Sequence, residues 1–307
     1  MMTDSHLAAA APIPPYLTAA LAQRFGPLAE EIAGGYPERR PVSLRVNTLK
    51  TDAASMKAAL TEAGIRFETL PWYADALVLP EAGEGEVRTL PLYSAGEIYL
   101  QSLSAMVPAL LFDLKRGESV LDMAAAPGGK SIQMAALSGG QISLTVCERD
   151  PIRFDRLKSN LALQGVRNVT ALRQDARELD DFFRFSHILL DAPCSGSGTL
   201  LLSGKPRRME ADWVRRLTRT QTALIRKALR LLSPGGDLVY ATCSILEEEN
   251  ENVVRAALSG GGCELLPVPE ALSGQLPTLP VSLEGTLCIR PTALYEGFFA
   301  ARLRKTK

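Results

Sequence analysis

From about residue 98 onward, short apolar runs alternate with longer stretches in which apolar residues recur at helical spacing. The runs predict strands and the stretches between them predict helices. We expect strands at residues 119–124, 142–148, 169–174, 187–191 and 237–242. We expect helices at residues 129–138, 151–164, 211–232 and 247–258. This alternation is typical of a doubly wound α/β fold built on a parallel sheet.

Two further strands are expected near the end of the chain, at residues 264–268 and 297–303. The last strand follows another strand instead of a crossover helix, so it is free to insert in the opposite direction. We therefore expect a mostly parallel sheet whose last strand is antiparallel.

The first part of the chain has a different pattern. Leu17, Leu21 and Phe25 recur at helical spacing, which predicts one or two short helices before the Gly34-Gly35 pair. The next segment predicts a β-α-β-β order and ends near an acidic turn, with elements at 42–49, 52–63, 67–70 and 76–79 and the turn at 81–86. This order predicts a small α+β domain. We expect an N-terminal helical segment, the small domain and a larger α/β domain, at residues 1–40, 41–97 and 98–307.

Composition narrows the possible classes of protein. The 307 residues contain 34 Lys and Arg and 34 Asp and Glu, so a nucleic-acid partner is not indicated by net charge. Five cysteines form no C-x-x-C pair and there are only two histidines, so no metal site is expected. The chain shows no leader pattern and no apolar stretch approaching about 20 residues. We therefore expect a cytoplasmic protein without membrane contacts.

The loop after the first strand of the large sheet is rich in small residues. It fits a phosphate-binding P-loop at Gly129, Lys130 and Ser131, but Ala124 stands where that motif has its first glycine. A P-loop NTPase is therefore the weaker interpretation, and the sequence has no dinucleotide fingerprint. We expect this loop to contact a cofactor through Ala124, Ala125, Ala126, Pro127, Gly128, Gly129 and Lys130.

Acidic residues follow the next two strands and indicate which cofactor this is. Glu148 lies about 20 residues beyond the loop, where a carboxylate accepts hydrogen bonds from ribose hydroxyls. Asp175 ends the third strand, where it can face an adenine amino group. Either acid alone could be a solvated strand end. Together with the loop they predict an S-adenosylmethionine site, which Asp191 on the fourth strand also borders.

Two cysteines follow apolar runs in short turns. Cys194 lies in the segment Asp-Ala-Pro-Cys-Ser-Gly, and Cys243 lies in the segment Ala-Thr-Cys-Ser. A single cysteine is usually a small buried core residue. Two at matching strand ends favour a shared site, because loops that follow parallel strands gather at one edge of the sheet. We expect the loop, Asp191 and both thiols to meet in one cleft.

These motifs resemble those of the RsmB/Sun-type (Nop/Nol) RNA cytosine-5 methyltransferases, from about residue 40 to the C-terminus. The segments that carry the resemblance are 45–50, 121–131, 191–196, 240–244, 249–251 and 297–299. The family often has a cysteine where this chain has Ala124. The resemblance implies a class I methyltransferase (Rossmann-like) fold that transfers a methyl group from S-adenosylmethionine to C5 of a cytidine in RNA.

Such chemistry requires a thiolate, because C5 of a pyrimidine is too electron-poor to take a methyl group unaided. Addition of a thiolate at C6 activates C5, and a base later removes the C5 proton so that the thiolate can leave. Spacing does not decide which cysteine attacks. DNA cytosine-5 methyltransferases use the Pro-Cys thiol, here Cys194. The resemblance instead implies Cys243 as nucleophile and Cys194 in product release, with protonated Asp191 bonding N3 of the base.

Basic residues after the first cysteine predict contacts with RNA phosphates, at Lys205, Arg207 and Arg208. By resemblance, ribosomal RNA is the favoured substrate, transfer RNA is the alternative, and the protein is expected to be a monomer. The main alternative function is a non-catalytic RNA-binding or assembly protein that keeps the cofactor fold. The presence of both thiols and all the acids counts against it.

Overall fold

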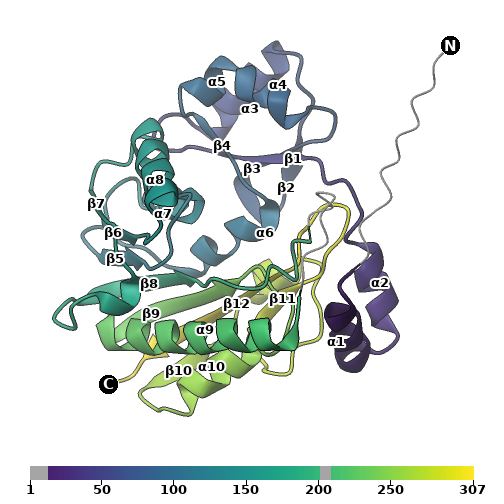
Figure 1. Ribbon diagram of the computed structural model, residues 1–307. Helices are drawn as coiled ribbons and strands as arrows, with labels where there is room; N and C mark the ends of the chain where they lie inside the picture. Colours follow the sequence, from purple (N-terminus) through teal and green to yellow (C-terminus); the bar gives the residue numbers. More distant parts are fainter. Residues whose placement is uncertain (1–12, 201–208) are drawn as a thin grey trace.

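The computed structural model describes residues 13–200 and 209–307 and contains two β-sheets (Figure 1). The larger sheet has the strand order β10-β12-β9-β8-β5-β6-β7. Its strands are β5 (Ser119–Asp122), β6 (Ser143–Cys147), β7 (Val169–Leu172), β8 (Phe185–Asp191), β9 (Leu232–Thr242), β10 (Cys263–Leu266) and β12 (Phe298–Lys305). A short strand, β11 (Leu287–Ile289), pairs with β12 outside this order.

Strand direction in the large sheet agrees with the sequence pattern. Strands β5 to β9 pair in parallel, and β12 pairs antiparallel with β9, β10 and β11. The physical reason lies in the connection: residues 290–297 join β11 to β12 without a crossover helix, so β12 returns alongside β11 in the opposite direction. The expected doubly wound fold with an antiparallel last strand is confirmed.

Helices cover both faces of this sheet, and alternate strand residues enter separate cores. Ile188 and Leu190 of β8 pack into the core that includes α9, whereas Leu189 packs into the core that includes α7. Figure 1 shows α9 and α10 lying along one face. The main helices between the strands of this sheet are α7 (Gly129–Leu137), α8 (Pro151–Leu163), α9 (Ala211–Leu231) and α10 (Glu251–Leu258). Within residues 13–200 and 209–307, no helix is long and apolar enough to cross a membrane.

Two element boundaries differ from the sequence prediction at positions that matter for the site. Strand β5 ends at Asp122 instead of residue 124, because the next residues leave the ladder to form the glycine loop. Helix α10 begins at Glu251 instead of residue 247. The residues before it form turns in which Glu249 and Asn250 are buried and hydrogen-bonded to the preceding loop.

The smaller sheet is antiparallel throughout and has the order β2-β3-β1-β4. Its elements are β1 (Val42–Val46), α3 (Ala53–Glu62), β2 (Glu68–Leu70), β3 (Tyr73–Leu79) and β4 (Ile98–Leu100). The separate small sheet is confirmed, but β4 lies beyond residue 97 and was not expected as its fourth strand. The acidic segment predicted to be the closing turn starts a helix instead, because the backbone N–H of Gly83 donates to the Glu86 carboxylate and caps it.

The shorter helices connect these units. They are α4 (Glu84–Thr89), α5 (Pro91–Ser94), α6 (Leu103–Met106), η1 (Pro108–Leu111), η2 (Ala176–Glu178) and α11 (Glu270–Ser273). Sequence periodicity did not reveal them because each has seven residues or fewer.

The N-terminal helices α1 (Pro15–Phe25) and α2 (Leu28–Gly34) pack against the large sheet's core. Leu17, Leu21 and Ile32 share the core cluster that contains residues of β8 and β9. Arg24 donates to the carbonyl of Ile245 at 3.1 Å, and Tyr36 donates to the carbonyl of Ser197 at 2.5 Å. This segment therefore contacts the loops that follow the two central strands.

Candidate active site

A cavity of about 300 Å³ lies at the carboxyl edge of the large sheet. The ends of five parallel strands, β5 to β9, contribute to it, as expected for an open α/β sheet. Side chains from α9 close another side, so the cavity is bounded by the strand ends and one helix. Its lining residues are Met123, Ala124, Ala126, Glu148, Arg149, Arg153, Gln174, Asp175, Ala176, Arg177, Asp191, Ala192, Pro193, Cys194, Gly196, Thr199, Thr220, Leu224 and Cys243.

This cavity brings together most of the residues singled out in the sequence. The acids, both thiols and two loop residues line it, namely Glu148, Asp175, Asp191, Cys194, Cys243, Ala124 and Ala126. Five other loop residues that were predicted to contact a cofactor lie outside this lining, namely Ala125, Pro127, Gly128, Gly129 and Lys130. The predicted RNA contacts Lys205, Arg207 and Arg208 lie outside the described residues.

Two glycines shape the loop. Gly128 has φ +112°, a left-handed conformation that favours glycine, and it caps the start of α7. At Gly129, a Cβ atom would come within 2.9 Å of a ring carbon of Tyr99. Arg45 of the small sheet also donates to the carbonyl of Gly129 at 3.3 Å. Gly129 is therefore required by the packing of the small sheet against the loop.

Asp122 fixes the base of the loop, and the sequence analysis missed it. Its carboxylate is buried and accepts a hydrogen bond of 2.5 Å from the Ser131 hydroxyl. Burial raises the pKa of Asp122 to about 6, and the charge of Asp191 acts in the same direction. The sequence signal that could have revealed Asp122 is its place as an acidic residue at the last position of a buried strand.

The acids at the ends of β6 and β7 face different neighbours. Glu148 is buried, accepts a 2.9 Å hydrogen bond from the backbone of Asp150 and lies 3.5 Å from Arg153. Asp175 is bound by Arg177 at 2.6 Å, and these hydrogen bonds lower the pKa of the Asp175 carboxyl. The arginines that line this end of the cavity, Arg149, Arg153 and Arg177, were not anticipated from the sequence.

The two thiols lie 3.2 Å apart, Sγ to Sγ. Their pKa values are displaced in opposite directions. The hydrogen bond from Cys194 lowers the pKa of Cys243, with help from Thr199 and the charge of Lys130. The same contact, together with burial and the charge of Glu249, raises the pKa of Cys194. This geometry favours a thiolate at Cys243 and a protonated thiol at Cys194.

Lys130 lies beside the thiols. Its ammonium group is 2.6 Å from the Asp191 carboxylate and 5.3 Å from the centroid of the Phe298 ring. Burial opposes the charge of Lys130, but Asp191 outweighs it and raises the lysine pKa. A lysine predicted as a cofactor contact thus lies in an ion pair at the thiol end of the cavity.

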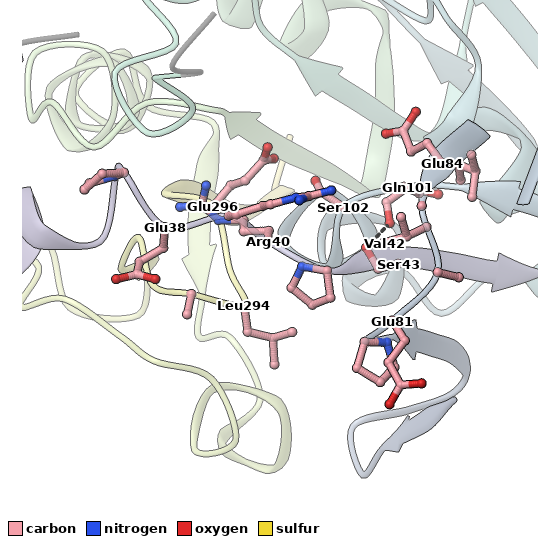
Figure 2. Close-up of a pocket in the computed structure, with 18 of the residues that line it drawn as sticks. Glu38, Arg40, Val42, Ser43, Glu81, Glu84, Gln101, Ser102, Leu294 and Glu296 are labelled. Carbon is pink, nitrogen blue, oxygen red and sulfur yellow. Dashed lines mark hydrogen bonds between the residues drawn. The ribbon is translucent and has the colours of Figure 1, made fainter. Parts of the chain in front are cut away.

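A second cleft, of about 1170 Å³, lies between the N-terminal linker, the small sheet and the loop before β12. Figure 2 shows side chains from these three parts of the chain around it, including Arg40, Glu84 and Glu296. None of the residues proposed from the sequence lines this cleft. Its charges are mixed, and Arg40 already donates to the carbonyls of Gly35 and Tyr295. The candidate active site is therefore the 300 Å³ cavity with the two thiols and not this larger cleft.

Comparison with known proteins agrees with this geometry. The family described as 16S rRNA methyltransferase RsmB/F matches residues 109–304, which include the glycine loop and both thiols. The chain belongs to this family. The ferredoxin-like domain of RsmF/B-like methyltransferases matches residues 13–85, so the family's domain pattern takes in the N-terminal helices and most of the small sheet.

Curated relatives support the family membership. Ribosomal RNA small subunit methyltransferase F of Klebsiella pneumoniae (strain 342) is 36% identical over 291 residues, covering 88% of this chain and 58% of the relative. The protein of the same name from Serratia proteamaculans (strain 568) is 36% identical over 283 residues, covering 88% and 57%. This chain therefore spans somewhat more than half the length of the curated relatives it matches.

Solved structures agree with the fold. A methyltransferase homolog protein from Pyrococcus horikoshii is 30% identical, with a TM-score of 0.83 over 95% of this chain and 100% of that chain. The NSun6 protein of the same organism, solved with SFG, has a TM-score of 0.87 at 22% identity over 96% of this chain and 99% of that chain. At that identity the second likeness shows the fold alone.

Proposed function

We propose that this protein transfers a methyl group from S-adenosylmethionine to C5 of a cytidine in RNA, through a covalent bond between Cys243 and C6 of the base. One observation carries the proposal. Two cysteine sulfurs lie 3.2 Å apart beside the ion pair of Asp191 and Lys130. Both cysteines and Asp191 line a cavity of suitable size for a nucleoside, and Lys130 lies next to it. A thiol pair with opposed pKa displacements suits one thiol to attack and the other to exchange a proton.

The residues present fit the methyl donor. The buried carboxylate of Glu148 faces the cavity and can accept hydrogen bonds from ribose hydroxyls, and Asp175 borders the adjacent wall. In the strand order, Asp191 on β8 lies between these acids, which follow β6 and β7, and Cys243, which follows β9. When bound, S-adenosylmethionine supplies an electrophilic methyl group. Glu148, Asp175, the end of β8 and the loop residues Ala124 and Ala126 would hold its nucleoside in the cavity that the two thiols also line.

The thiols and the ion pair then act on the base. The Cys243 thiolate would add to C6 and move electron density to C5, which would take the methyl group as the S–CH₃ bond of the donor breaks and S-adenosylhomocysteine leaves. Lys130 is placed to donate a hydrogen bond to the N3 edge and stabilise the negative charge that gathers there, while the Asp191 carboxylate accepts from the same ammonium group and holds it in place. A base removes the C5 proton, and the C6–S bond breaks to release Cys243. Cys194, in contact with that sulfur, is placed to assist the release.

Ribosomal RNA is the proposed substrate. The curated relatives are named ribosomal RNA small subunit methyltransferases, and the matched family is described by its 16S rRNA substrate. Transfer RNA is the alternative that the experiment must separate. Because this chain spans little more than half of those relatives, its own substrate is proposed from the likeness and from the site together.

The experiment is a transfer assay with purified protein and labelled S-adenosylmethionine. Small-subunit ribosomal RNA and bulk transfer RNA are supplied separately, and nucleosides are identified by mass spectrometry after digestion. We expect 5-methylcytidine in ribosomal RNA and none with the Cys243→Ser variant. A methyl group on a ribose or on a ring nitrogen would overturn the cytosine-5 chemistry, and labelling confined to transfer RNA would overturn the substrate.

A further inference from the structure

A single buried carboxylate bonds both thiol-bearing loops. Glu249 is completely buried in the turns between β9 and α10. Its Oε1 atom accepts hydrogen bonds from the backbone N–H of Ser195 at 2.8 Å and from Nε2 of Gln221 at 3.0 Å. Its Oε2 atom accepts from the hydroxyl of Ser244 at 2.7 Å and from the hydroxyl of Ser195.

The positions of these donors are informative. Ser195 directly follows Cys194, and Ser244 directly follows Cys243. The same carboxylate therefore bonds the residue after each thiol, and Gln221 links it to α9 and to the carbonyl of Pro193. We call these contacts between Glu249 and the residues Ser195, Gln221 and Ser244 the carboxylate clasp.

Core packing alone does not explain an ionisable group here. Among the residues that the structure describes, Glu249 makes no ion pair with a lysine, arginine or histidine, so its burial is opposed by desolvation. A glutamine would not serve equally well. The carboxylate accepts at both oxygens, whereas an amide would place its NH₂ group against the Ser195 and Ser244 hydroxyls, which would have to turn and accept instead of donating.

The charge of Glu249 also acts on the thiols. The ionisable groups around the sulfurs are Asp191 from β8, Lys130 from α7, Tyr240 from β9 and Glu249 itself. Glu249 opposes ionisation of Cys194, whereas Lys130 favours ionisation of Cys243. The carboxylate thus contributes both to the geometry of the pair and to its chemical inequality.

We propose that Glu249 is a positioning residue that holds the two thiol loops in register and places a negative charge beside Cys194. The inference rests on the proposed function, but its central test needs no RNA. Glu249 does not line the cavity, so it acts through Ser195 and Ser244.

The test compares Glu249→Gln with Glu248→Gln, a neighbouring acid outside the clasp whose carboxylate contacts Tyr16. Iodoacetamide is applied over a pH series, and alkylation of each cysteine is followed by peptide mass spectrometry. In the wild-type protein and in Glu248→Gln, Cys243 should react at lower pH than Cys194. In Glu249→Gln, Cys194 should react about tenfold faster at pH values well below its original midpoint, where the rate follows the small thiolate fraction and a tenfold change in the ionisation constant gives a tenfold change in rate. If the difference between the pH midpoints for alkylation of Cys194 and Cys243 were the same in Glu249→Gln as in the wild type, the electrostatic effect of Glu249 on Cys194 would be overturned.

Kinetics test the positional part. The single-turnover methylation rate of Glu249→Gln should fall about 100-fold while the KM for RNA changes little, since a misplacement of about 1 Å costs this much. Cofactor binding and the melting temperature are measured alongside. A wild-type methylation rate in Glu249→Gln would overturn the positioning role of Glu249. The control variant Glu248→Gln should keep the wild-type rate.

A second variant keeps the proposal testable if Glu249→Gln does not fold. Ser244→Ala removes one donor and leaves the carboxylate in place, so methylation should slow about tenfold with the Cys194 alkylation profile unaltered. A wild-type rate in Ser244→Ala would overturn the clasp. If the wild-type protein methylates no RNA at all, the proposed function fails, and the alkylation profiles still decide the role of Glu249.

Discussion

The loops after β8 and β9 look alike in sequence and differ in chemistry. Both follow neighbouring parallel strands, in which Asp191 pairs with Ala241, and both carry a cysteine followed by a serine. Yet the pKa of Cys243 is lowered and that of Cys194 is raised. The main cause is the hydrogen bond between the two thiols, which lowers one pKa and raises the other, and neighbours on other elements add to it, Lys130 beside Cys243 and Glu249 beside Cys194. Equivalent motifs thus acquire different roles from their surroundings.

The largest effect should separate the two thiols directly. Cys243→Ser should lower methyl transfer by at least about 10³-fold, because a serine hydroxyl is too weakly acidic to add at C6 without a dedicated base. Cys194→Ser should still allow attack and methylation and then stall before release. Denaturing electrophoresis should show a covalent RNA–protein complex in that variant and none in Cys243→Ser.

The opposite assignment, with Cys194 as the nucleophile, makes the reverse prediction. An adduct that forms in the Cys243 variant and is lost in the Cys194 variant would exchange the two roles. The cytosine-5 chemistry would still stand, since it needs only one attacking thiolate.

The next effect concerns the lysine beside Cys243. Replacing Lys130 with Met removes a positive charge that favours the thiolate and leaves Asp191 unpaired, so the pKa of Cys243 should rise. At neutral pH the thiolate fraction falls, and the transfer rate should fall by about 10- to 100-fold. The loss should shrink as pH increases. The double variant Lys130→Met/Asp191→Asn, which restores local neutrality, should recover the pH midpoint for alkylation of Cys243. If the pH midpoint for alkylation of Cys243 were equal in the wild type and in Lys130→Met, Lys130 would not be a cause of the lowered pKa of Cys243.

A smaller effect concerns the cofactor end of the cavity, away from both thiols. Glu148→Ala should weaken S-adenosylmethionine binding by about 1.5–3 kcal/mol, because the ribose hydroxyls lose a charged acceptor. Asp175→Ala should lose less binding free energy, because the Asp175 carboxylate already forms ion pairs with Arg177 and Arg149. Calorimetry measures both, with the exposed Asp155→Ala as control. Unchanged affinity in both site variants would mean that the nucleoside lies elsewhere.

The smallest effect tests the support of the β8 loop by the N-terminal segment. Tyr36→Phe removes the hydrogen bond to the carbonyl of Ser197 and keeps the ring. Unfolding in urea should show a loss of about 1 kcal/mol, with a modest decrease in transfer rate. The Cys243 alkylation profile should not move. A shift in that profile would show that the two loops respond as one unit and would weaken the contrast drawn above.

The sequence by itself determined the architecture of the large sheet. Most of its strands are apolar runs separated by helices of eight residues or more, so periodicity located them and the antiparallel last strand. The short elements around the small sheet escaped because four- to six-residue helices and the three-residue β4 carry little periodic signal. The start of α10 was misplaced because Glu249 and Asn250 are retained by loop contacts instead of continuing the helix.

The candidate site divides in the same way. Sequence motifs predicted that the loop, the acids and the two thiols would meet, because the carboxyl ends of parallel strands share one edge. Only the tertiary structure placed Lys130 against Asp191, set the sulfurs 3.2 Å apart and brought Glu249 to both loops. These contacts join residues from different strands and helices, and their electrostatic effects depend on distance and burial. Neither quantity is contained in the spacing of residues along the chain.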